Sequence, residues 1–206
     1  MAKGILGKKV GMTQLFQDDG AVVPVTVIEA GPCVVVQKKT EQNDGYTSLK
    51  LGFEDVKPNK LNKPELGQFE KRGIEPKKYT KEIRDFDGDL DEGDEVTVNI
   101  FEKGEKVDIS GKTKGKGFAG NIRRWNHNTG PKTHGSRFHR APGSIGSTDA
   151  ARVFKGQKLP GRMGQDNVTI KNLEIVEVDN DKNVIMVKGA VPGPKKTVLT
   201  IKNENE

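Results

Sequence analysis

The sequence predicts a mainly β protein in which one barrel, built from both ends of the chain, carries a long, basic, largely irregular extension. Three observations support this fold class. Short segments rich in Val and Ile, separated by turn signals, occur on both sides of the middle of the chain. The middle has few large apolar residues, and nearly all of its charges are positive. A length of 206 residues is sufficient for one barrel and such an insertion.

The first group of expected strands lies in the N-terminal half. Segments at residues 13–16, 22–29, 34–38 and 46–53 are separated by the turn signals Asp18-Asp19-Gly20, Gly31-Pro32 and Asn43-Asp44-Gly45. Asp-Gly pairs between apolar segments are typical of tight turns joining antiparallel strands. We therefore expect a meander of short strands in this half.

A Lys/Glu-rich insertion follows at residues 59–95, and we expect one short helix within it at residues 77–86. Its acidic run does not match a calcium-binding loop, because Leu90 stands where that loop requires Gly and Val96 where it requires Glu. A solvated acidic loop is therefore the expected form of the run. Two further strands are expected at residues 96–101 and 107–110.

The C-terminal part of the chain also has the pattern of short strands separated by turns. Strands are expected at residues 168–178, 184–188 and 197–201, separated by a turn at 179–182 and a Gly/Pro-rich break at 189–194. Neither end of the chain has enough strands for a stable sheet of its own. We therefore expect one globular β-barrel domain from residues 1–108 and 165–206, with residues 109–164 as a long excursion from it.

Residues 109–164 differ in composition from the rest of the chain. They contain 12 Lys or Arg residues and one acid, Asp149, whereas the other 150 residues carry 23 bases and 28 acids. All three His residues, the single Trp and 11 of the 25 Gly residues also lie there. Only 8 of the 56 residues are Leu, Ile, Val or Phe, too few to build a core. This composition favours a polyanion as partner, with RNA the leading candidate, while a solvated basic linker is the plain alternative.

We expect no metal, no cofactor and no catalytic residue. Residues 115–120 match the pattern G-x-G-x-x-G, but no acid follows at the spacing that a dinucleotide site requires. His127, His134 and His139 lie among arginines that would repel a cation, and no nearby carboxylate or thiol completes a metal site. General acid–base chemistry needs only two imidazoles, so a His-dependent ribonuclease stays open as an alternative.

The expected location is the cytoplasm, with no membrane partner. Cys33 is the only thiol, so no internal disulfide calls for an oxidising compartment. The first residues include Lys3, Lys8 and Lys9 and no apolar stretch of signal-peptide length. No later segment approaches the ~18 apolar residues of a membrane-spanning helix.

Five segments resemble the universal large-subunit ribosomal protein L-three family. In the segment FEKGEKVDISGKTKGKGFAGNIRR at residues 101–124, the positions that match the signature of that family are Phe101, Asp108, Gly111, Thr113, Gly115, Lys116, Gly117, Gly120 and Arg124. The other segments are GKKVGMTQLF at 7–16, HGSRFHRAPGSIG at 134–146, VFKGQKLPGRMG at 153–164 and VKGAVPGPKK at 187–196. The resemblance therefore covers nearly the whole chain.

The resemblance implies a structural, non-catalytic ribosomal protein with a translation-factor-type barrel. It implies an extension that runs through 23S ribosomal RNA toward the peptidyl transferase centre. It also implies early binding near the 3′ end of that RNA, a role in starting large-subunit assembly, and neighbours from the L-fourteen and L-nineteen families. One departure is that Ser147, Thr148 and Asp149 stand where some bacterial members carry a methylated Gln, so we expect that modification to be absent.

Candidate rRNA-binding residues follow from composition and resemblance together. Lys and Arg attract phosphates, Gly lets backbone amides approach the same oxygens, and Trp and His offer flat faces to bases. These candidates are Lys8, Lys9, Lys112, Lys114, Lys116, Gly115, Gly117, Arg123, Arg124, Trp125, His127, Lys132, His134, Arg137, His139, Arg140, Arg152, Lys155, Lys158 and Arg162. The expected tip near the peptidyl transferase centre consists of Gly143, Ser144, Gly146, Ser147 and Asp149.

Some alternatives stay open at this point. Phe118, Phe138 and Phe154 are expected to pack locally and stiffen the extension, although Phe138 is also a stacking candidate. Lys8 and Lys9 lie either at a second RNA contact beside the barrel or in a solvated turn. For the whole protein, a free-standing RNA chaperone or regulator is the alternative to a ribosomal scaffold protein.

Overall fold

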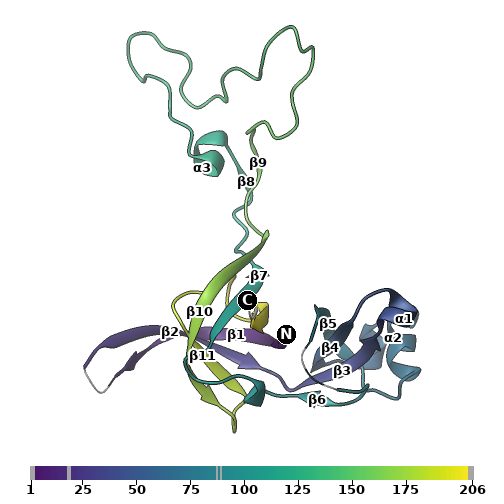
Figure 1. Cartoon of the computed structure of the whole chain (residues 1–206). Helices are drawn as coiled ribbons and strands as arrows, with labels where there is room; N and C mark the ends of the chain where they lie inside the picture. Colours follow the sequence, from purple (N-terminus) through teal and green to yellow (C-terminus); the bar gives the residue numbers. More distant parts are fainter. Residues whose placement is uncertain (1–2, 18–19, 87, 89, 204–206) are drawn as a thin grey trace. The chain divides into compact units, whose positions relative to one another are not determined.

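The computed structural model describes residues 3–17, 20–86, 88 and 90–203. The chain divides into two compact units (Figure 1). Met1–Lys112 and Asn167–Glu206 form what we call the barrel unit, and Thr113–Asp166 form the loop unit. Asp18 and Asp19 of an expected turn, and Asp87 and Asp89 of the acidic run, lie outside the described residues.

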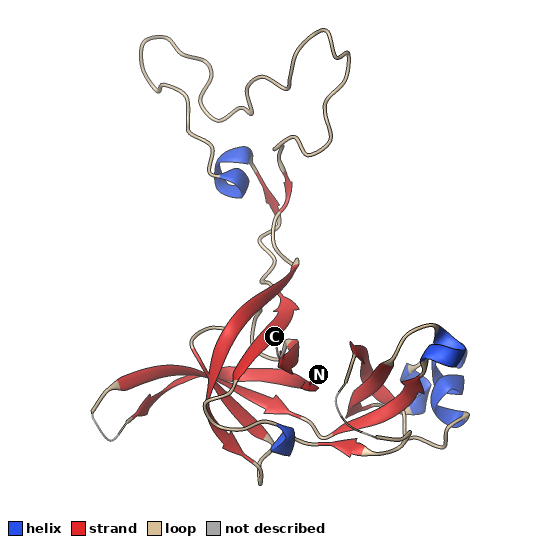
Figure 2. Ribbon diagram, in the orientation of Figure 1, coloured by secondary structure: helices blue, strands red, loops and turns tan. Residues whose placement is uncertain are grey.

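Six antiparallel strands close into a barrel that uses both ends of the chain (Figures 1 and 2). In spatial order they are β1 (Lys3–Phe16), β12 (Val198–Asn203), β7 (Lys106–Lys112), β10 (Asn167–Asp179), β11 (Val184–Lys188) and β2 (Val22–Ala30). The N-terminal and C-terminal strands pair directly, with Ile5 of β1 opposite Ile201 of β12. The prediction of a mainly β chain with a barrel closed by both ends is confirmed.

Alternate residues of these strands fill the barrel core. Ile5, Ile28, Ile109, Ile185 and Ile201 are fully buried. β-Branched side chains fit the pleated surface of a strand well, and each buried Ile contributes about 1.5–3 kcal/mol through removal of its apolar surface from water. The period-2 pattern of the sequence thus produces both the strands and their buried face.

Strand β7 continues four residues beyond the expected end of the barrel domain. Its last residues, 109–112, had been expected to begin the extension. In the structure Ile109 is buried, and Gly111 lies opposite both Val168 of β10 and Leu199 of β12. β7 is paired on both edges as far as Gly111, and Lys112 still pairs with Asn167 of β10, so the loop unit begins at Thr113.

A second, four-stranded antiparallel sheet also belongs to the barrel unit (Figure 2). Its order is β5 (Lys77–Arg84), β4 (Ser48–Asp55), β3 (Cys33–Lys39) and β6 (Glu95–Val96). The expected strands at 34–38 and 46–53 are present, but they pair here rather than in the barrel, which corrects the expectation of a single sheet. Buried Val35, Leu51 and Ile83 join the same hydrophobic core as the barrel residues.

The helix expected within residues 77–86 is wrong, because this segment forms β5. Ile83 is fully buried opposite Leu49, and Tyr79 lies opposite Phe53. Cross-strand packing of this kind overrides a weak local helical pattern. The strand expected at 96–101 is also shorter than predicted, since β6 ends at Val96 and a 3₁₀ turn, η2, covers Val98–Ile100.

The helices are short. In the barrel unit they are α1 (Glu41–Asp44), the 3₁₀ turn η1 (Pro58–Lys60) and α2 (Lys63–Glu70), and the loop unit contains α3 (Asn121–Trp125). α2 begins at a capping residue, Asn62, whose side chain accepts a hydrogen bond from the Glu65 amide at 3.0 Å. Phe69 is the one buried residue of α2. Within the described residues, no helix has the length and apolar character needed to cross a membrane.

Cys33 is buried in β3, and we expect its thiol to be unreactive in the folded protein. Burial raises the pKa of this thiol to about 12, while a contact of 3.5 Å with the Leu6 carbonyl opposes the shift. The reactive thiolate is therefore almost absent at pH 8. Iodoacetamide at pH 8 should leave the native protein unlabelled and label it rapidly in urea, as followed by mass spectrometry. Equal labelling rates in both states would contradict this expectation.

Candidate nucleic-acid interface

The loop unit starts as a stem of two antiparallel chain segments. In β8 (Phe118–Ala119) and β9 (Gly161–Arg162), Phe118 lies opposite Arg162. The ladder continues through a hydrogen bond from the Lys116 amide to the Met163 carbonyl at 2.9 Å. Gly164 has a φ of +77°, and a Cβ there would collide with the Lys114 carbonyl oxygen, so this close approach of the two segments requires glycine. The stem thereby gives Lys114, Lys116 and Arg162 a defined backbone.

Helix α3 is fastened to the returning segment by three side chains. Asn121 Nδ2 donates to the Lys158 carbonyl at 2.9 Å, while Arg124 Nη1 and Trp125 Nε1 donate to the Leu159 carbonyl at 2.8 and 2.9 Å. The Arg124 guanidinium also lies 4.9 Å from the centre of the Trp125 ring. Arg124 and Trp125, both predicted to bind RNA, therefore shape the loop unit itself.

Residues 126–160 contain no helix or strand (Figure 2). Their order comes from local contacts, such as the hydrogen bond from the Gly130 amide to the His139 carbonyl at 2.9 Å. His139 Nδ1 lies 2.9 Å from the Pro131 carbonyl oxygen, which accepts only if that nitrogen is protonated. A Cβ on Gly130 would collide with the Phe138 carbonyl. Two segments eight residues apart are thus held together without regular structure.

Cations on the loop unit are exposed and lack acidic partners. The exposed members of the predicted set are Lys114, Lys116, Arg123, Lys132, Arg137, Arg140, Arg152, Lys155, Lys158 and Arg162. Throughout the loop unit, all of whose residues are described, none of them forms an ion pair. Their mutual repulsion is therefore uncompensated within the protein, which favours binding of a polyanion.

Exposed aromatic rings lie among these cations. Phe118 is 79% exposed and Phe154 54% exposed, and the Arg152 guanidinium lies 5.1 Å from the centre of the Phe154 ring. The rings were expected to pack locally, but each presents a large free surface. Such rings beside cations are the usual platform for stacking unpaired bases. Phe118 and Phe154 were absent from the predicted RNA-binding set, although aromatic residues spaced among cations in a coreless segment are a usable signal.

The two predicted cations in β1 are already engaged within the barrel unit. Lys8 forms an ion pair with Glu54, and hydrogen bonding to this carboxylate raises the Lys8 pKa. Lys9 is only 8% exposed, and its Nζ donates to the carbonyls of Val191 at 3.0 Å and Gly193 at 3.3 Å. The side chain of Lys9 therefore faces the protein rather than the solvent, and we leave it out of the candidate interface.

The expected tip, residues 143–149, is exposed along its whole length. Gly143 and Gly146 have φ angles of +83° and +141°, and their backbone turns are supported by a hydrogen bond from the Gly146 amide to Ser144 Oγ at 3.3 Å.

Among the residues that the structure describes, no group of three His, Cys, Asp or Glu residues is arranged to hold a metal ion.

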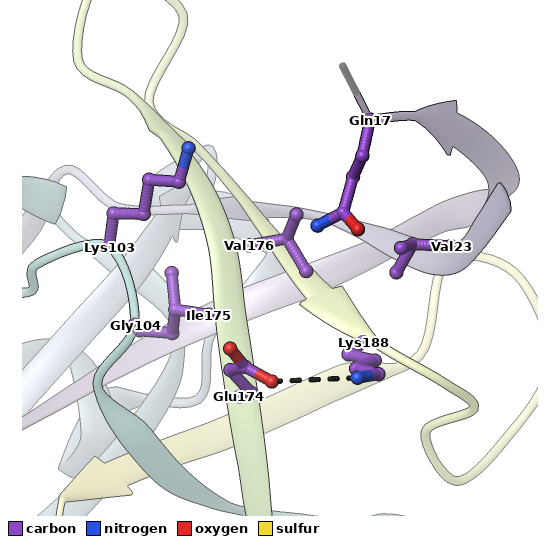
Figure 3. A pocket seen from close by; sticks show the side chains of 8 residues that line it. All are labelled: Gln17, Val23, Lys103, Gly104, Glu174, Ile175, Val176 and Lys188. Carbon is purple, nitrogen blue, oxygen red and sulfur yellow. Dashed lines mark ion pairs between the residues drawn. The ribbon is translucent and has the colours of Figure 1, made fainter. Parts of the chain in front are cut away.

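A small recess on the barrel unit differs from the loop unit in its charge (Figure 3). It lies between Val23, Lys103 and Ile175, and Glu174 and Lys188 approach one another at 3.7 Å on its wall. Because one of its two cations is paired with an acid, this recess has much less positive charge than the loop unit. The loop unit is therefore the stronger candidate for an anionic partner.

A β scaffold that bears an irregular unit with exposed, unpaired cations and free aromatic rings is typical of proteins that bind nucleic acid. A family model described as Ribosomal protein L3 matches residues 79–183. Large ribosomal subunit protein uL3 of Natranaerobius thermophilus is 59% identical over 98% of this chain and 96% of its own length. The proteins of that name from Oceanobacillus iheyensis and Carboxydothermus hydrogenoformans are each 56% identical over 98% of this chain and 97% of their own. The chain belongs to the ribosomal protein L3 family.

Proposed function

We propose that this chain is a structural constituent of the large ribosomal subunit that binds 23S ribosomal RNA and helps to start assembly of the subunit. The observation that carries this proposal is the set of exposed cations on the loop unit, which have no acidic partner there. Membership of the ribosomal protein L3 family supports the same role, and the proposed location is the ribosome in the cytoplasm. The proposed role requires binding and no catalytic step.

The loop unit is, on this proposal, a long basic extension that enters the RNA, and the barrel is of the translation-factor type. Residues 143–149 then form the tip that approaches the peptidyl transferase centre, where small residues such as Gly143, Ser144 and Gly146 allow close passage. Proteins of the L-fourteen and L-nineteen families are the proposed neighbours. Support comes from the resemblance of the sequence motifs and from the exposed, irregular course of residues 126–160.

The side chains divide the binding task. Lys114, Lys116 and the exposed arginines bind phosphates, which positions the protein without reading sequence. The rings of Phe118 and Phe154 stack on unpaired bases. Arg124 and Trp125 act mainly by holding α3 against Leu159, so that the neighbouring cations are presented in a fixed arrangement.

Salt dependence of RNA binding tests the proposed function. We expect the full chain to bind 23S ribosomal RNA with a log–log salt slope of about −0.7 to −0.9 per neutralised phosphate, because each cation that binds a phosphate releases a counterion. Replacing Lys114 and Lys116 with Ala should reduce the magnitude of that slope by about 1.5. Filter binding over a series of KCl concentrations measures both values.

The matched control replaces Lys60 and Lys63 with Ala, since these exposed lysines lie in the acid-rich insertion of the barrel unit. This control should retain the slope of the unmodified protein. Equal slopes for all three proteins would show that Lys114 and Lys116 do not contact RNA. Degradation of the RNA by the purified chain would instead identify the ribonuclease alternative.

A further inference from the structure

The connection between β11 and β12, residues 189–197, is a loop of defined shape on the barrel unit. At its start, the Gly189 amide donates to the Pro24 carbonyl at 2.8 Å and Thr26 Oγ1 donates to the Gly189 carbonyl at 2.6 Å. At its end, the Lys196 amide donates to the Lys9 carbonyl at 2.7 Å. Both ends of the loop are thus tied to neighbouring strands.

Lys9 of β1 holds the middle of this loop through hydrogen bonds to its backbone. Its buried ammonium donates to the carbonyls of Val191 and Gly193, so these two carbonyls are turned toward the barrel. Residues 191–193 are buried as a result, whereas Pro194, Lys195 and Lys196 are exposed. A buried ammonium is tolerated only when its hydrogen bonds are satisfied, so the loop and Lys9 stabilise one another.

The loop lies against the end of β7. Gly193 has a φ of +89°, and a Cβ at this position would lie 2.6 Å from the Lys112 carbonyl oxygen. Lys196 also adopts a left-handed conformation, with φ +67°, which is uncommon for a residue with a side chain. The loop backbone therefore lies against the backbone of exposed Lys112, while the Lys195 ammonium lies 3.9 Å from the position that a Cβ on Gly11 of β1 would occupy.

These three lysines differ from many other cations of the barrel unit. Lys3, Lys8, Lys38, Lys39, Arg72, Lys77, Lys78, Lys182 and Lys188 each lie within ion-pair distance of an acid. Lys112, Lys195 and Lys196 form no ion pair with any residue that the structure describes. Their charges are therefore available to an external anion.

We propose that Lys195 and Lys196, together with Lys112, form a phosphate-binding site for an RNA backbone on the barrel unit itself. This inference rests on the proposed function, which supplies RNA as the anion. Lysine ammonium groups bind phosphate as compact point charges, without selecting a base sequence. The site gives the barrel unit its own attachment to RNA, and its ordered backbone means that little loop entropy is lost on binding.

Substitution of both new lysines by Gln tests this site in the full chain. K195Q/K196Q should reduce the magnitude of the salt slope for 23S ribosomal RNA by about 1.5 and weaken binding about tenfold near 0.15 M KCl. K60Q/K63Q, which removes the same charge elsewhere on the barrel unit, should leave both unchanged. Equal urea midpoints for the two variants would confirm that the fold is intact.

A second readout locates the contact directly. Acetylation of lysines by an N-hydroxysuccinimide ester, followed by mass spectrometry, should show Lys195 and Lys196 protected in the RNA complex and Lys60 and Lys63 unprotected. Unprotected Lys195 and Lys196, with a salt slope equal to that of the unmodified protein, would overturn the inference while the proposed function stands. Failure of the unmodified protein to bind the RNA at all would instead overturn the proposed function.

Discussion

Replacement of Gly7 by Ala should destabilise the barrel unit by about 3 kcal/mol, because overpacking in a rigid core costs roughly 1–3 kcal/mol or more. Gly7 lies in β1 between two partner strands, opposite Ala30 of β2 and Leu199 of β12. A Cβ here would lie 2.8 Å from Ile28 Cγ2 and 2.9 Å from the Glu29 carbonyl oxygen. The backbone oxygen cannot move away unless the pairing of β1 with β2 opens.

Gly67→Ala is the matched control. Gly67 lies inside α2, and apart from the adjacent helix backbone no atom lies within 4 Å of the position its Cβ would occupy. Since Ala is a better helix former than Gly, this change should raise the free energy of unfolding by about 0.5–1 kcal/mol. Urea unfolding followed by far-UV circular dichroism measures both effects. A Gly7→Ala midpoint equal to that of the unmodified protein would show that the barrel absorbs the extra methyl group.

The strands could be predicted from the sequence where apolar and polar residues alternate. The neighbouring strands with which they pair could not. Alternation at residues 184–188 and 197–201 is visible in the sequence because one face of each strand is buried. Which sheet a strand joins depends on contacts between distant residues, such as Leu49 with Ile83. For this reason residues 34–38 and 46–53 were correctly expected as strands but assigned to the wrong sheet.

The positive charge of the candidate interface could be predicted from the amino-acid composition. The contacts made by individual side chains could not. The cation-rich stretch at residues 109–164 overlaps the loop unit, Thr113–Asp166, over all but a few residues at its ends. By contrast, Lys9 reads as an exposed cation in GKKVG until the structure places it beneath residues 191 and 193, far along the chain. Lys195 and Lys196 were not among the predicted RNA-binding residues, because the sequence of their segment shows only a resemblance to the family. That their loop lies against the end of β7 is visible only in the structure.

Substitution of Ser144 by Arg should impair peptide-bond formation while leaving subunit assembly nearly normal. On the proposed placement, Ser144 lies at the tip of the extension close to the peptidyl transferase centre, where its small exposed side chain leaves room for RNA. Arginine would displace neighbouring nucleotides, and a misplacement of about 1 Å at a reacting centre can lower a rate about 100-fold. The phosphate-binding cations are untouched, so RNA affinity should not fall.

The control is Gln157→Arg, which adds the same charge at an exposed position of the loop unit outside the tip. In cells that contain only the variant protein, sucrose-gradient profiles measure assembly, and single-turnover dipeptide formation by the purified subunits measures the reaction. We expect the Ser144→Arg subunits to assemble at close to the normal level and to react roughly 10- to 100-fold more slowly, with Gln157→Arg normal in both assays. A loss of assembly with normal dipeptide formation in the subunits that do form would place Ser144 at an assembly contact, away from the reaction centre.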